Sequence, residues 1–113
     1  VNSKFEGDYL NKKKWNGKEY DINDEDIYEI KNGNGFIKEY NKKGRLLFEG
    51  EYLNGEKNGK CKEILDDGKL KFEGIYKNGK RNGKGKEYYN YHIPKIIFEG
   101  EYLNGKRNGK GKE

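Results

Sequence analysis

The stretch that decides the fold is FEGEYLNGKRNGKGKE, residues 98–113, because the chain contains it three times in nearly the same form. The other copies are FEGEYLNGEKNGKCKE from Phe48 and FEGIYKNGKRNGKGKE from Phe72. Successive copies begin 24 and 26 residues apart, and the longer step carries the insertion NYHIP at 90–94. A period of this length is typical of proteins that stack one small structural unit many times.

Two less regular units precede these copies. One is FEGDYLNKKKWNGKEYD from Phe5, and the other is the degenerate IYEIKNGNGFIKEYNKKG at 27–44. The chain begins at Val1 and stops inside the last unit, so we expect it to be part of a longer array or to be capped. The sequence predicts one repeat array over 1–113, with units at roughly 5–21, 22–44, 45–68, 69–94 and 95–113.

Within each unit the residues alternate between two faces, which is typical of β-strands. One face of the first strand carries Leu46, Phe48, Gly50 and Tyr52. Asn-Gly pairs at 54–55, 78–79 and 104–105 are typical of tight hairpin turns, and DDGK (66–69) and KKGR (42–45) of the turns between units. We therefore predict an all-β fold, an elongated single-layer antiparallel meander of stacked β-hairpins with about ten strands.

Glycine recurs between two aromatic residues on the same predicted face, as in Phe48-x-Gly50-x-Tyr52. Glycine normally weakens a strand, but its bare backbone leaves room for a ring from a neighbouring strand. The opposite face carries Glu on first strands and Lys on returning strands, which favours weak cross-strand pairs. Since a single-layer sheet leaves a face open, we expect the aromatic face to remain uncovered.

Composition favours a folded but thin protein. Charged residues make up 40% of the 113, yet aromatics reach 14% and the net charge is only +5, which argues against disorder. No apolar run approaches the length of a membrane span, and no signal peptide is evident. Because the single cysteine, Cys61, cannot form an internal disulfide, we expect a soluble protein of a reducing, cytoplasmic compartment. A location at the cytoplasmic face of a membrane or at the cytoskeleton is an alternative within this expectation.

The string FEGEYLNGKRNGKG resembles the MORN (membrane occupation and recognition nexus) repeat, whose consensus runs aromatic-x-Gly-x-aromatic, Asn-Gly-Lys, Gly-x-Gly. The match is strong at 48–61, 72–85 and 98–111, distorted at 5–17 and weak at 22–40. The resemblance implies a curved sheet of hairpins that acts as a scaffold or protein-binding module, and in some members as a binder of acidic phospholipids.

One feature departs from the usual MORN pattern. In KEYY (86–89), Glu87 stands where an apolar or aromatic residue is common. This variant is similar to the MORN-like repeats of bacterial antitoxin-type proteins, which adds an immunity or antitoxin role as a third, lower hypothesis.

The residues of catalysis and metal binding do not converge in this sequence. Ser3, His92 and Cys61 are each alone of their kind, and Cys61 occupies a slot that glycine holds in sister units. The acidic stretch 21–26 lacks the EF-hand glycine and glutamate, and GKRNGKGK (105–112) lacks the P-loop spacing. We predict a non-enzymatic protein with no cofactor, no metal site and no nucleic-acid partner.

We predict two candidate surfaces. The leading one binds a protein partner, either a helix, an extended segment or a second copy, through the aromatic face of Phe48, Tyr52, Phe72, Tyr76, Phe98 and Tyr102. The alternative binds acidic phospholipid headgroups through basic hairpin tips, namely Lys80, Arg81, Lys84, Lys106, Arg107 and Lys110.

Overall fold

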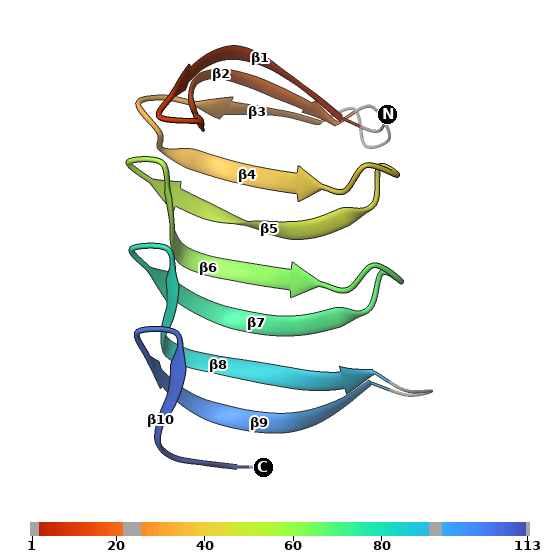
Figure 1. Ribbon diagram of the computed structural model, residues 1–113, viewed down its shortest axis with the longest axis vertical. Helices are drawn as coiled ribbons and strands as arrows, with labels where there is room; N and C mark the ends of the chain where they lie inside the picture. The colour runs from red at the N-terminus through yellow and green to blue at the C-terminus, as the bar shows by residue number, and fades with distance from the viewer. Residues whose placement is uncertain (1–2, 22–25, 91–93, 113) are drawn as a thin grey trace.

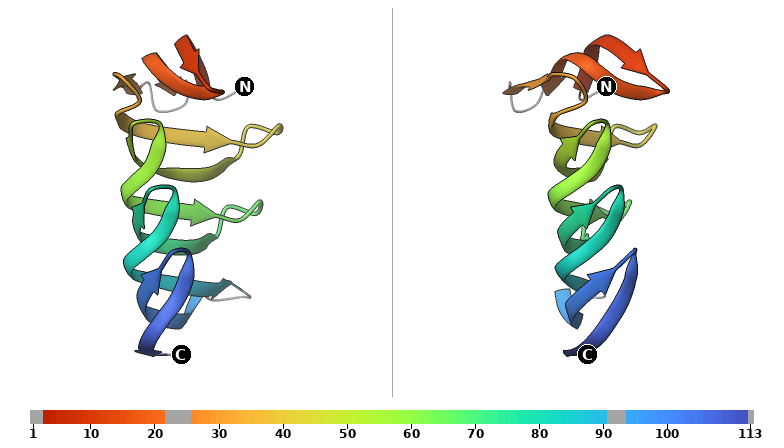
Figure 2. Two further views of the ribbon diagram at one scale, coloured as in Figure 1. Left: turned by 60° about the vertical axis from the view of Figure 1, so that its left-hand side comes forward. Right: turned by 90° about the vertical axis from the view of Figure 1, so that its left-hand side faces the viewer.

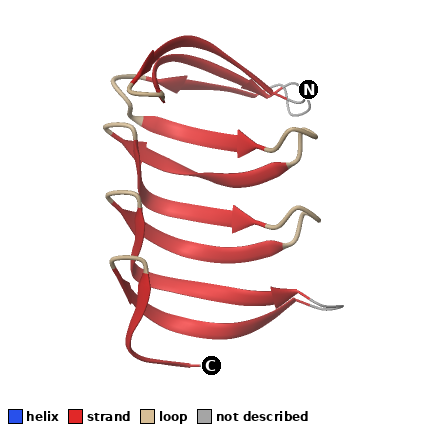
Figure 3. Ribbon diagram, in the orientation of Figure 1, coloured by secondary structure: helices blue, strands red, loops and turns tan. Residues whose placement is uncertain are grey.

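The computed structural model describes residues 3–21, 26–90 and 94–112 (Figure 1). His92 and most of the acidic stretch 21–26 lie outside this part. Across the described residues there are ten strands and no helix (Figure 3). The strands are β1 (Ser3–Leu10), β2 (Lys13–Asp21), β3 (Asp26–Ile30), β4 (Gly35–Tyr40), β5 (Leu46–Leu53), β6 (Glu56–Ile64), β7 (Leu70–Lys77), β8 (Lys80–Asn90), β9 (Pro94–Leu103) and β10 (Lys106–Lys112).

The strands form two antiparallel sheets in which each strand pairs with its neighbours in the sequence. β1, β2 and β3 make the small sheet, and β4 to β10 make the large one. The molecule measures 42 × 30 × 19 Å, with the small sheet at one end and β10 at the other (Figure 1, Figure 2). The predicted all-β hairpin meander of about ten strands is confirmed, but the break between β3 and β4 was not predicted.

The Asn-Gly pairs form the predicted hairpin turns. Asn54, Asn78 and Asn104 each have φ of 51°, in the left-handed region that asparagine tolerates better than most residues. The following glycines have φ between 82° and 88°. Two successive residues with positive φ match the right-handed twist of the flanking strands, so each pair closes a two-residue hairpin.

These turns are joined to one another by a ladder of hydrogen bonds, which we call the turn ladder. Gly79 N–H donates to the Lys57 carbonyl at 2.9 Å, and Gly105 N–H to the Arg81 carbonyl at 2.8 Å. Beside them the Asn78 N–H donates to Asn58 Oδ1 at 3.4 Å. The second asparagine of each unit therefore links neighbouring hairpins, a role that the sequence analysis missed although its recurrence in KNG and RNG marks it.

The turn ladder also crosses the break between the sheets. Gly33 N–H donates to the Trp15 carbonyl and Gly55 N–H to the Gly33 carbonyl, both at 2.8 Å. Asn54 N–H donates to Asn34 Oδ1 at 2.8 Å, and Asn32 N–H to Asn16 Oδ1 at 2.9 Å. The two sheets are thus held at one edge even where their strands separate.

Each first strand of the large sheet carries a β-bulge just before its phenylalanine. Glu39 pairs with Phe48 but Tyr40 pairs with Leu46, so Leu47 is the extra residue. Directly paired residues share a face of the sheet, which places Leu46 on the face opposite Phe48. The prediction that Leu46 shares the phenylalanine face is therefore wrong, and the same shift recurs in register at Leu70 and Ile96.

The break between the sheets coincides with the degenerate unit. Counted back from the turn asparagine, the phenylalanine and glycine of the other units are replaced by Asp26 and Tyr28. β3 pairs with β2, and it meets β4 through the single bridge of Lys31 and Asn34. The unit that lacks the aromatic-Gly pair is therefore the unit whose hairpin divides between two sheets.

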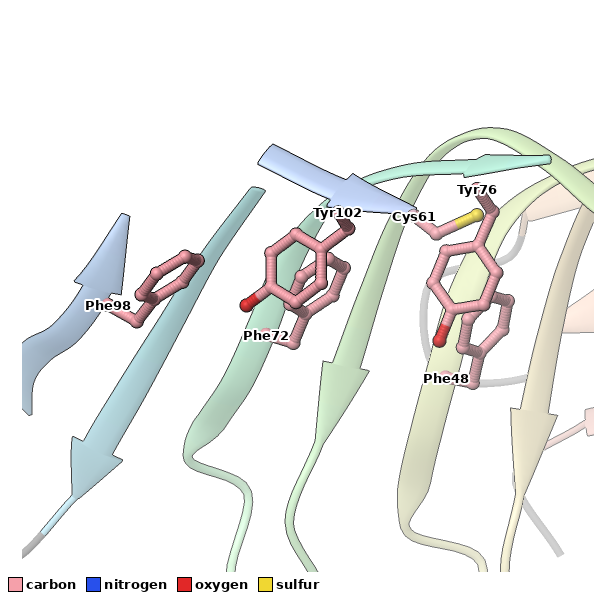
Figure 4. Close-up of a cluster of buried hydrophobic side chains, with 6 residues drawn as sticks. All are labelled: Phe48, Cys61, Phe72, Tyr76, Phe98 and Tyr102. Carbon is pink, nitrogen blue, oxygen red and sulfur yellow. The ribbon is translucent and has the colours of Figure 1, made fainter. Parts of the chain in front are cut away.

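Aromatic rings of the large sheet form the core (Figure 4). Phe72 is fully buried, and Phe48, Tyr76, Phe98 and Tyr102 are at most 7% exposed. The expectation of an uncovered aromatic face is therefore wrong. The predicted packing of rings on glycine is confirmed, because a Cβ placed on Gly85 would lie only 2.7 Å from the Phe72 ring.

Candidate interaction surfaces

Each buried phenylalanine of the large sheet is covered by a basic side chain from its own hairpin tip. Lys57 Nζ lies 3.9 Å from the Phe48 ring centre, and the Arg81 guanidinium carbon lies 4.0 Å from that of Phe72. Arg107 repeats the contact on Phe98 at 4.3 Å. Such cation–π contacts explain how a single-layer sheet buries its rings without a second layer.

The same arginines hold carboxylates of the returning strands. Arg81 Nε and Nη2 each lie 2.8 Å from an oxygen of Glu63, and its Nη1 lies 3.3 Å from Glu87. Arg107 Nη2 in turn lies 2.8 Å from Glu87. The hydroxyl of Tyr76 donates to Glu63, completing one repeat of an Arg–Glu–Tyr network that consists of Arg81, Glu63, Tyr76, Arg107, Glu87 and Tyr102.

The network shifts the protonation of its members. Burial alone raises the pKa of Glu63, but hydrogen bonds from Arg81 and Tyr76 and the Arg81 charge outweigh it and lower the pKa below the usual 4.5. The Arg107 hydrogen bond lowers the pKa of Glu87, against a smaller opposing effect of burial. Both carboxylates are therefore ionised at neutral pH and paired with arginine.

The structure separates the predicted basic-tip residues into two groups. Arg81 faces inward, with 18% of its side chain exposed, and Arg107 forms a salt bridge with Glu87. Lys80, Lys84 and Lys106 are exposed. Lys110 lies on β10. The two tips that carry an arginine therefore present Lys80 and Lys106 to solvent and turn the arginine onto the core.

The face opposite the rings carries a row of alternating charges. In register across six strands, Glu49 pairs with Lys62, and Glu73 with Lys62 and Lys86. The row continues to Lys38 on β4 and Glu99 on β9. This confirms the predicted Glu–Lys register. The Lys86–Glu99 pair, at 3.9 Å and more than 40% exposed, is of a kind that contributes about 0.2–1 kcal/mol.

This charged face contains a hollow of about 850 Å³, which we call the charged-face hollow. Its floor is strand backbone at glycine positions, and its walls are the charged rows. Ile75 lies within it, at the position where sister units have Glu51 and Glu101. A half-buried apolar side chain at a position otherwise held by glutamate gives the hollow one apolar point among charges, with Phe36 a second at its end.

The described residues offer little chemistry for catalysis. No group of three or more His, Cys, Asp or Glu side chains within them is placed to hold a metal ion. Cys61 is buried opposite Gly50, as expected for a residue in a glycine slot, and burial raises the pKa of its thiol to about 11. The thiol is therefore protonated at neutral pH and poorly nucleophilic. No helix in the described part of the chain is both long and apolar enough to cross a membrane.

Comparison with protein-family models finds MORN repeats at 48–69, 72–90 and 98–113, just over half of the chain. The chain belongs to the MORN-repeat family. MORN repeats are generally non-enzymatic modules that interact with proteins or membranes. The family model does not match residues 5–44, so the two earlier units are assigned from their sequence pattern alone. A search of curated proteins finds no match.

The MORN match covers the strands in which the predicted binding residues lie, but the structure gives those residues other contacts. Five of the six predicted aromatic residues are core, and Tyr52 alone is half-buried. Sequence analysis missed the carboxylates that bind the arginines and tyrosines. The unusual Glu87 in the MORN pattern was the available indication, because a charged residue at an inward position needs a partner.

Proposed function

We propose that this chain is a non-enzymatic MORN-repeat interaction module that binds a protein segment along its charged-face hollow. The observation that carries the proposal is Ile75, an apolar side chain that replaces glutamate within a hollow of about 850 Å³. We propose that the six aromatic residues serve this surface from the other side, by fixing the shape of the sheet.

The charges around Ile75 suggest what kind of segment fits. The row through Glu73 alternates in sign, but Ile75 itself pairs with Lys60 and lines the hollow together with Lys84. Because Ile75 replaces the glutamate of the sister units there, the hollow favours a partner segment with an acidic residue next to its apolar one. An apolar side chain of the partner over Ile75 would supply the buried centre that most interfaces need. Paired rim charges then add specificity more than affinity.

To test the proposal, the chain is immobilised as bait and incubated with extract from its native source. Partners are crosslinked and quantified by mass spectrometry for the parent chain and for Ile75→Glu, which restores the residue of the sister units and so keeps the fold. We expect the crosslinked partner to fall about tenfold, since about 1.4 kcal/mol of lost burial corresponds to that factor.

The matched control is Ile97→Glu, a change of the same kind at a bulge residue that is 37% exposed. It should retain the partner. If Ile75→Glu captures the same partner as the parent, or if both variants lose it equally, the charged-face hollow is not the binding surface.

Exposed tip lysines favour a second candidate function, binding to acidic phospholipids. Lys80 and Lys106 stand on successive hairpin tips with their side chains in solvent. Flotation with phosphatidylserine vesicles tests it, comparing the parent with a Lys80→Glu and Lys106→Glu double variant and with Lys95→Glu as control. Binding lost in the double variant alone supports the function, and binding that needs no anionic lipid contradicts it.

A cytoplasmic site of action and an antitoxin or immunity role stay predictions. The first rests on the lone, buried thiol of Cys61, and fractionation of the source cells would test it. The second rests on KEYY alone, and the genes next to this one would test it.

A further inference from the structure

The aromatic core follows one rule in the two units that a complete unit precedes. Each tyrosine packs edge-to-face on the phenylalanine of the preceding unit, as Tyr76 does on Phe48 at 5.8 Å and Tyr102 on Phe72 at 5.3 Å. The cation that covers that phenylalanine also reaches the tyrosine, as Arg81 does at 5.6 Å from Tyr102. The ring of each such tyrosine is thus covered by an aromatic ring and a cation from the preceding unit.

Tyr52 is the exception, because the unit before it supplies neither group. The position that holds phenylalanine elsewhere, six residues before the turn asparagine, is Asp26. The position of the cation, three residues after that asparagine, is Gly35. Tyr52 accordingly remains half-buried, whereas Tyr76 and Tyr102 are 7% and 3% exposed.

A hollow of about 610 Å³ lies at this place, between the small sheet and the ring side of the large one. We call it the joint hollow. Its apolar lining comes from Tyr9, Ile37, Tyr40 and Tyr52, and its volume lies in the range of ordinary ligand sites. It shares no lining residue with the charged-face hollow.

The charges at the joint hollow are net positive. Lysines at 12, 13, 14 and 57 line it. Lys13 pairs with Glu56 and Lys14 with Glu19, which leaves Lys12 and Lys57 against the one carboxylate of Glu39. Lys12 is exposed at the hairpin tip of the small sheet and pairs with no other residue in the described ranges.

We propose that the joint hollow binds an aromatic side chain of a partner segment in which an acidic residue lies next to that ring. The ring packs beside Tyr52 and against Ile37, which stands at the register position that Gly85 holds in a complete unit. The net positive lining favours the electron-rich ring, and Lys12 pairs with the adjacent carboxylate. This site is separate from the charged-face hollow, so each proposal stands or fails alone.

The test uses a capped synthetic hexapeptide, Gly-Ser-Phe-Asp-Glu-Gly, titrated into the full chain. Trp15, the sole tryptophan, reports binding by fluorescence, because its ring lies 3.2 Å from a Cβ built on the hollow residue Gly55. Two control peptides are compared with this one: in the first, Ala replaces Phe, and in the second, Asn and Gln replace Asp and Glu. We expect each control peptide to bind at least about tenfold more weakly than the parent peptide.

Two variants of the chain locate the site. Lys12→Glu should weaken the binding of the Phe peptide by about tenfold. Lys106→Glu should leave that binding unaltered, because it makes the same change on an exposed tip at the other end of the molecule. Circular dichroism confirms the fold of each, and Lys12→Gln replaces Lys12→Glu if the latter unfolds. No saturable binding, equal binding of the Ala peptide, or equal effects of the two lysine variants would overturn the proposal.

Discussion

The large sheet and the joint between β3 and β4 are built from the same repeat, yet one is continuous and the other is broken. In the large sheet the phenylalanine-x-glycine pair recurs at 48–50, 72–74 and 98–100, and a phenylalanine ring lies close to Gly74, Gly85 and Gly100. At the joint, Asp26 and Tyr28 replace the pair, and the Tyr28 ring packs 5.3 Å from Phe36 instead. The unit that lacks this pair is therefore the unit whose two strands separate.

The comparison teaches that two kinds of interaction hold this array together. The turn ladder is made by backbone and asparagine groups, and it passes through the joint without interruption. Strand pairing is lost only between β3 and β4 in the described chain, within the unit that lacks the phenylalanine-x-glycine pair, although β3 still pairs with β2. At the joint, the hairpin turns remain linked by the turn ladder, but the strands separate and the joint hollow lies between them.

Replacing a ring should have the largest effect, and a different one on each side of the comparison. Phe72→Ala removes a fully buried ring and should destabilise the chain by about 3–5 kcal/mol. Phe36→Ala, at the half-buried joint, should cost about half as much or less. Denaturant unfolding measures both, and equal losses would mean that the joint is packed as tightly as the large sheet.

Removing the inward arginine should have the next largest effect. Arg81→Gln leaves the part-buried Glu63 without its charged partner and uncovers Phe72, which should cost about 2 kcal/mol. The neighbouring Lys80→Gln changes an exposed side chain and should stay within about 0.5 kcal/mol. A thermal unfolding comparison separates the two, and similar shifts would show that the arginine acts as an ordinary surface charge.

The same network predicts a dependence of stability on pH. Glu63 and Glu87 have pKa values lowered on folding, so their contribution is present above the unfolded pKa near 4.5 and is lost as pH falls through the folded values. The free energy of unfolding should therefore decrease as pH falls below about 4.5. Glu63→Gln should flatten this decrease, whereas Glu49→Gln on the charged face should leave it nearly unchanged.

Repairing the joint should have the smallest effect on stability but the most direct one on the comparison. Asp26→Phe with Tyr28→Gly restores the motif of the complete units and should pair β3 with β4, at a gain of about 1 kcal/mol. Hydrogen exchange of the β4 backbone amides, Gly35–Tyr40, should slow. Unchanged exchange would show that other residues of the degenerate unit keep the sheets apart.

Sequence reasoning predicted the strands, the turns, the charge register and the family, because each follows from local pattern. Period-two alternation and Asn-Gly pairs act within a few residues, so they can be read directly. The bulge at Leu47 could not be foreseen, because an extra residue in one strand is defined only against its partner strand. The burial of Tyr76 and Tyr102 was missed for the same reason, since what covers them comes from other hairpins.

The repeat FEGEYLNGKRNGKGKE by itself determined that this chain would be a stack of β-hairpins with rings packed over glycine. Only the tertiary structure decided which side of the sheet is available to a partner. Arginines that the sequence placed on solvated tips fold back onto Phe72 and Phe98, because Glu63 and Glu87 from neighbouring strands hold them there. That contact closes the aromatic face and leaves the charged face, the joint and the tip lysines as the surfaces where binding is proposed.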